Sequence, residues 1–169
     1  EEAYRRMIDL VGLAEDRLAR AGRARFVPVA LPAALAPLEE VAPVLRGALG
    51  GKRWLLDHRA GAAVLDYVNG EELERYGQAG VVTPDHVIRT KGKPLILPPP
   101  EAGKLDAWRA AARSALTEFA SDYDAYFGRN NGRDGVPKTQ LDTLPRVVMV
   151  RGLGLFGVGA GAGAAAIAA

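Results

Sequence analysis

The chain has 169 residues, of which 49% are hydrophobic and 25% are charged; these ordinary values exclude a disordered or collagen-like chain. It has no cysteine, which excludes a disulfide framework, a thiol nucleophile and a Cys-based zinc or iron–sulfur site. The net charge of +2 is too small for the electrostatic footprint of a nucleic-acid-binding protein. We therefore expect one soluble α/β domain, or one domain with a fragment of another.

The first part of the chain predicts two helices joined by an extended segment. Apolar residues recur at three- and four-residue steps over residues 1–21, which predicts an amphipathic helix that ends at Gly22. Residues 26–32 contain two prolines and are expected to be extended. A second helix is predicted over 34–49, where Pro43 indicates a kink or a later start. The chain opens inside a helical pattern without an initiator Met, so we expect a piece of a longer polypeptide.

The central part predicts short elements. Residues 53–58 and 94–97 have the composition of buried strands, and 71–76 of a short helix. Periodicity leaves 62–68 open between strand and helix. Residues 81–86 are expected to form a loop or a strand end.

The last part predicts a long helix over 104–128, a surface loop over 129–135 and a strand over 146–150. A glycine-rich turn over 152–163 is expected to lead into a helix that starts near residue 163. Strands that alternate with helices favour an α/β fold, which we expect to be a three-layer α/β/α domain with a mixed sheet.

Gly152, Gly154 and Gly157 spell G-x-G-x-x-G after a predicted strand, a pattern typical of dinucleotide-binding turns. The sequence ends at residue 169, before a second strand and a ribose-binding acid could follow, so a glycine-rich strand-to-helix turn is the favoured interpretation. An NAD-binding oxidoreductase fragment remains an alternative. The uncharged run 152–169 approaches the length of a membrane span, but its Gly and Ala favour a buried strand end and helix, and no membrane partner is expected.

Two polar clusters are candidate sites. Asp85 and His86 could supply a general base or a metal ligand, and Arg89 and Lys91 could bind a phosphate or carboxylate. The alternative is a loop in which these side chains have structural roles. The second cluster, at 57–59, contains the other histidine, and a structural role is favoured there because its spacing requires no metal.

Three segments, 80–91, 144–148 and 152–159, resemble the bifunctional class II aldolase/short-chain dehydrogenase family. The first of them reads GVVTPDHVIRTK. That family includes rhamnulose-1-phosphate aldolase/lactaldehyde dehydrogenase fusions, in which a zinc aldolase region, a middle region and an NAD-binding dehydrogenase follow one another. The resemblance implies that 1–22 is the last helix of the aldolase region and 23–169 is the middle domain, cut before the dehydrogenase. It also implies a cytoplasmic enzyme of rhamnose metabolism whose flanking regions use zinc and NAD.

Within this resemblance, the middle region is interpreted as a degenerate copy of the class II aldolase fold. Asp57 and Arg59 stand where the family has two zinc-binding histidines, and Leu153 stands at the place of the third. A cation and an alkyl chain cannot replace imidazole ligands, and the Arg59 guanidinium is expected to hold Asp57 or an anion. The resemblance therefore implies no catalytic residue, metal or cofactor in this chain.

The resulting hypothesis is a non-catalytic domain that joins the flanking aldolase and dehydrogenase regions and contributes to the subunit interface of a homo-oligomer. The helix over 104–128 is its expected packing surface. In the alternative, Asp85, His86, Arg89 and Lys91 bind a sugar phosphate at a neighbouring aldolase site. No nucleic-acid partner is expected.

Overall fold

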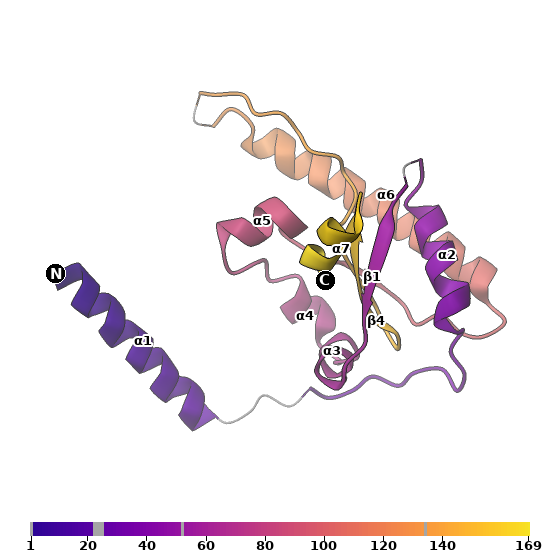
Figure 1. Ribbon diagram of the computed structural model, residues 1–169, viewed down its shortest axis with the longest axis horizontal. Helices are drawn as coiled ribbons and strands as arrows, with labels where there is room; N and C mark the ends of the chain where they lie inside the picture. The colour runs from indigo at the N-terminus through magenta and orange to yellow at the C-terminus, as the bar shows by residue number, and fades with distance from the viewer. Residues whose placement is uncertain (1, 22–25, 52, 134) are drawn as a thin grey trace.

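The computed structural model describes residues 2–21, 26–51, 53–133 and 135–169 (Figure 1). The described strands are β1 (Leu55–Arg59), β2 (Leu95–Leu97), β3 (Val147–Val150) and β4 (Gly154–Gly159). The described helices are α1 (Glu2–Ala21), α2 (Leu38–Ala48), α3 (Ala62–Val68), α4 (Leu73–Gly77), α5 (Pro84–Thr90), α6 (Leu105–Asn130) and α7 (Ala162–Ala168).

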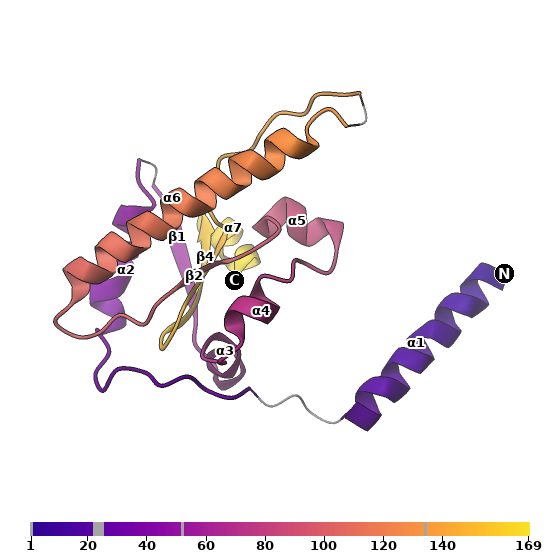
Figure 2. The ribbon, with the colours of Figure 1, turned by 180° about the vertical axis from the view of Figure 1, so that it is seen from behind.

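The strands form one mixed sheet in the order β1-β4-β3-β2. The β1–β4 and β3–β4 pairs are antiparallel, whereas β2 and β3 are parallel. Helices α2 and α6 pack on one face of the sheet, and α3, α4 and α7 lie on the other (Figures 1 and 2). The expected three-layer α/β/α architecture with a mixed sheet is therefore confirmed.

The α2/α6 face of the sheet is packed with large side chains. Alternation along a strand sends every second residue to the same face, so Val148 and Val150 of β3 and Phe156 of β4 all point toward α2 and α6. The helices contribute Leu45 and Trp108, and the indole N–H of Trp108 donates a hydrogen bond of 2.9 Å to the carbonyl of Pro98. This face holds the main hydrophobic core.

On the opposite face, α7 rests directly on the backbone of β4. A Cβ at Gly157 would lie 2.1 Å from the carbonyl oxygen of Ala165, and a Cβ at Gly159 would lie 2.3 Å from the nitrogen of Ala165. Real side chains never approach that closely, so only glycine allows this packing. The glycines of β4 are thus a requirement of helix packing.

The strand-to-helix turn expected over 152–163 is wrong, because an antiparallel strand occupies half of that segment. Gly152 lies in the turn after β3, and Gly154 opens β4 with a φ of +112°. The helix begins at Ala162, close to the start predicted near residue 163. The G-x-G-x-x-G pattern therefore lacks the adjacent helix N-terminus that a dinucleotide-binding turn needs.

The segment 62–68, which periodicity left open, is the helix α3. The loop or strand end expected over 81–86 is wrong, because α5 begins at Pro84 after Thr83 in extended conformation. Proline suits the first position of a helix, since its fixed φ is compatible and its missing N–H has no partner there. Pro84 after Thr83 is therefore a sequence signal that predicts the start of this helix.

Helix α1 forms as predicted and lies away from the sheet in Figures 1 and 2; none of its residues is buried. The predicted helix end at Gly22 and the boundary between residues 22 and 23 lie outside the described residues. Among the described residues, no helix combines the length and apolar content needed to cross a bilayer.

Candidate functional site

The strand β1 places Asp57 and Arg59 on one face of the sheet. Their cross-strand partners in β4 are Gly157 and Leu155, and directly opposed residues share a face. The Nε of Arg59 lies 2.7 Å from Oδ1 of Asp57, and both side chains are partly exposed. An ion pair between Arg59 and Asp57 therefore occupies the two positions that, by the resemblance, correspond to zinc ligands.

His58 points to the opposite face. Its Nε2–H donates a hydrogen bond of 2.8 Å to the carbonyl of Leu153, and its ring lies against Phe156 with centroids 4.7 Å apart. The side chain of Leu153 packs against the core on the same α2/α6 face. The structure thus brings β1 and the turn after β3 together, but Leu153 points away from Asp57 and Arg59.

These residues do not fit a zinc site. One face offers a single carboxylate already paired with a cation, and the other offers an imidazole bound to a carbonyl. In the part of the chain that the structure describes, no three His, Asp or Glu side chains are grouped to share a metal ion. The metal-free state of this domain stays a prediction.

The second candidate cluster lies on and just after α5. Asp85, His86 and Arg89 are exposed, and Thr83 Oγ1 shares a hydrogen bond of 2.7 Å with Nδ1 of His86. The two hollows described below are lined by other residues. The three side chains therefore form an open, polar helix surface.

Lys91 is separated from that surface. It is only 5% exposed, its Nζ donates to the carbonyl of Asp142, and the same atom lies 3.7 Å from the centroid of the Tyr123 ring. Burial lowers the pKa of Lys91, the charge of Arg146 lowers it further, and Asp142 partly opposes the shift. The proposed group of four is thus split into three exposed residues and one buried lysine.

Asp142 forms an ion pair with Arg146 beside this lysine. Burial by itself raises the pKa of the Asp142 carboxyl, but the hydrogen bond and charge of Arg146 outweigh burial and hold it below its usual value. The guanidinium of Arg146 also lies over the Trp54 ring, 5.1 Å from its centroid. These contacts fasten the segment before β3 to the α2/α6 face.

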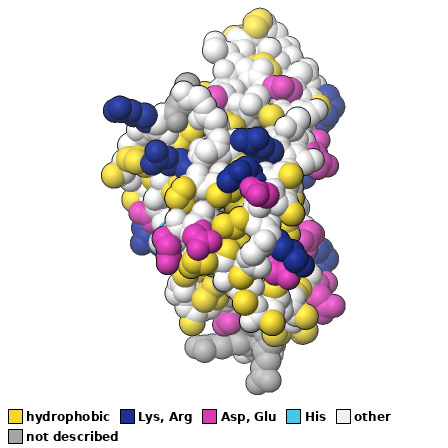
Figure 3. Space-filling view, turned by 90° about the vertical axis from the view of Figure 1, so that its right-hand side faces the viewer, with side chains coloured by type: hydrophobic (Ala, Val, Ile, Leu, Met, Phe, Trp, Pro, Cys, Tyr) yellow, Lys and Arg dark blue, Asp and Glu magenta, His cyan; other side chains and the backbone are white. Residues whose placement is uncertain are grey.

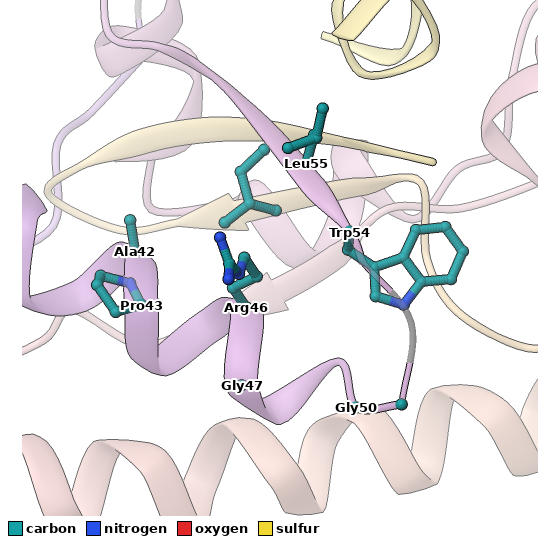
Figure 4. A pocket seen from close by; sticks show the side chains of 9 residues that line it. Ala42, Pro43, Arg46, Gly47, Gly50, Trp54 and Leu55 are labelled. Carbon is teal, nitrogen blue, oxygen red and sulfur yellow. The ribbon is translucent and has the colours of Figure 1, made fainter. Parts of the chain in front are cut away.

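A hollow of about 780 Å³ lies between α2 and β1 (Figure 4). Its walls are mainly apolar, with the exposed Arg46 as the charged lining residue. A smaller hollow of about 450 Å³ lies beside the start of α6. Sequence reasoning predicted neither hollow, because both depend on how helices meet the sheet.

Arg151 is a buried cation that sequence reasoning missed. Its Nη1 donates to the carbonyl of Gly70 at 2.9 Å, and its Nη2 donates to Oε2 of Glu74 at 2.7 Å. The next backbone N–H, of Gly152, donates to Oδ1 of Asn69 at 2.7 Å. A charged residue directly after the buried strand β3 was the available signal. Its bonds fix the β3–β4 turn to the α3–α4 connection.

The two candidate clusters do not come together into one site. Asp57, His58 and Lys91 each take part in a bond within the chain, whereas Asp85 and Arg89 are exposed on α5. One side of the molecule shows interspersed basic and acidic side chains rather than a single basic field (Figure 3).

Comparison with known proteins gives a family match and one curated relative. The family described as aldolase class II, second domain, matches residues 36–169. The chain is 30% identical over 168 residues to an uncharacterized oxidoreductase, YuxG, of Bacillus subtilis (strain 168). That alignment covers 94% of the chain but only 24% of the relative. No solved structure matches the chain.

Proposed function

Because this chain belongs to the family of aldolase class II second domains, we propose that it is a non-catalytic domain of a larger enzyme. The observation that carries the proposal is the Arg59–Asp57 ion pair at the end of β1. A catalytic zinc needs three good protein ligands and an open position. Here a cation occupies one expected ligand position, and the Leu153 side chain lies on the other face of the sheet.

The larger enzyme is proposed to be a sugar-phosphate aldolase, a lyase, fused to an NAD-dependent short-chain dehydrogenase. Two findings support this: the aldolase family match, and a relative named an oxidoreductase of which the chain spans about a quarter. In this proposal, zinc and NAD bind to the flanking regions. Residues 1–22 belong to the aldolase region, and 23–169 link it to the dehydrogenase. A role in rhamnose metabolism and a cytoplasmic location complete the proposal.

Metal analysis of the purified chain tests the non-catalytic role. We expect far less than one zinc per chain after equilibration with zinc and removal of free metal. A matched variant, Asp57→His with Arg59→His, offers imidazoles at the two degenerate positions and should raise zinc retention if the place is otherwise aldolase-like. Stoichiometric zinc in the unaltered chain that is lost on His58→Ala or His86→Ala would overturn the proposal.

A second function is favoured by one observation, the exposure of Asp85, His86 and Arg89 on α5. In this alternative they bind a sugar phosphate at a neighbouring aldolase site. Arg89→Ala in the full-length enzyme should then raise the KM for aldol cleavage, while the matched change Arg75→Ala on α4 should not. Unchanged cleavage kinetics in Arg89→Ala would remove the alternative.

A further inference from the structure

The strand β1 is an open edge of the sheet. It pairs with β4 on one side only, and no backbone hydrogen bond joins its other side to the described residues. Leu55 on this strand is 42% exposed, although its cross-strand partner Gly159 is buried. An edge of this kind offers a row of N–H and C=O groups to another strand.

The hydrogen-bond pattern shows which residues of β1 offer those groups. The N–H of Val158 in β4 donates to the carbonyl of Arg146 at 2.8 Å, so the backbone groups of Val158 point toward β3. Leu56 lies opposite Val158 and is therefore in a pair without hydrogen bonds, with its own N–H and C=O pointing outward. By alternation, His58 also points its backbone groups outward.

Side-chain charges then select one register for pairing with an identical strand. Antiparallel pairing of outward residues allows Leu56 opposite its copy, Leu56 opposite His58, or His58 opposite its copy. The first places Asp57 opposite an apolar residue. The second places Asp57 opposite Asp57, which is unfavourable. The third places Asp57 opposite Arg59 twice, once on each side of the axis.

We propose that two copies of this chain associate through their β1 strands, antiparallel, with the two-fold axis at His58. The two four-stranded sheets then form one continuous sheet. The hollow between α2 and β1 lies beside the joining strand (Figure 4). The inference rests on the proposed structural role only in expecting a subunit interface, and it does not depend on whether zinc binds.

Charge reversal at the edge tests the register. Asp57→Arg and Arg59→Asp each place like charges opposite one another in both cross-axis pairs, and we expect the dimer dissociation constant to rise roughly ten-fold or more. The double exchange, Asp57→Arg with Arg59→Asp, restores both pairs and should restore the dimer. An equal mixture of the two single variants should form a heterodimer for the same reason. Sedimentation velocity measures each mass.

The exposed ion pair between Arg75 on α4 and Glu72, the residue before that helix, provides the matched control, because it has the same charges away from β1. Glu72→Arg should leave the dimer unchanged, and circular dichroism should confirm that every variant is folded. A monomeric unaltered chain at all concentrations would overturn the proposal. So would a dimer that both single variants retain, which would place the interface elsewhere, on α1 for example. Neither result alters the zinc measurement.

Discussion

The two faces of the sheet reach close packing by opposite means. Toward α2 and α6, β4 presents Phe156 and Val158, both fully buried among large side chains. Toward α7, the same strand presents Gly157 and Gly159, and the helix backbone itself fills the space. One six-residue strand thus alternates between large side chains and none. The comparison shows that a glycine-rich motif can be required for close packing of a helix on a strand and need not indicate a ligand-binding site.

The largest expected effect breaks the side-chain-packed face. Phe156→Ala removes a fully buried ring from the core and should lower the free energy of unfolding by about 3–5 kcal/mol. Denaturant unfolding followed by circular dichroism measures the loss. The control Leu155→Ala, at a partly buried position on the other face, should lose less. Equal losses would contradict the assignment of the main core to the α2/α6 face.

The next effect breaks the backbone-packed face. Gly157→Ala places a methyl group against the carbonyl of Ala165 and should cost about 3 kcal/mol, the upper part of the range for overpacking, because backbone must move. Hydrogen exchange should show that the α7 amides lose protection first. Gly163→Ala, in α7 with open space around it, should be neutral or slightly stabilising. A neutral Gly157→Ala would show that α7 does not rest on β4.

An intermediate effect is expected at Arg151, the cation that joins the turn after β3 to α4 on the α7 side of the sheet. Arg151→Met leaves the Gly70 carbonyl without its charged donor and should cost about 2 kcal/mol. Thermal and denaturant unfolding both measure this change. Arg75→Met, which breaks an exposed ion pair on the same helix, should cost much less, because solvent screens that pair. Similar costs for the two variants would contradict the structural importance of burial at Arg151.

The smallest effect is expected from the Asp142–Arg146 ion pair, which lies at the edge of the α2/α6 face of the sheet. The pKa of Asp142 is lowered by Arg146, so its contribution is present above the usual pKa of 3.8 and is lost as pH falls through the lower folded value. Asp142→Asn should lower stability near neutral pH by about 0.5–1 kcal/mol. The difference should vanish in strong acid. A difference that persists there would show that the carboxylate charge is not its cause.

Local pattern was sufficient for most of the fold. The apolar face over 104–128 predicted α6, observed at Leu105–Asn130, and alternating elements predicted the layers. The segment 152–163 was misassigned because its glycines suit either a turn or close packing. The choice depends on α7, which folds back onto β4 through contacts that no short window reveals.

The candidate site was predictable where partners are close in sequence. Arg59 was expected to hold Asp57, and the ion pair is present. The partners of Lys91 and Arg151 were not predictable, because Asp142 is 51 residues from the lysine and Gly70 is 81 residues from the arginine. A buried cation finds its acceptor through the topology of the whole sheet.

Lys91 has a φ of +65°, and among the described residues other than glycine it is alone in having a positive φ. It follows α5 at a position where glycine is the usual residue, and Gly92 comes directly after it. A glycine at position 91 would relax the local chain but release the anchor on the Asp142 carbonyl. The chain therefore accepts an unfavourable backbone conformation at Lys91, and in return the end of α5 stays bonded to the distant segment that contains Asp142.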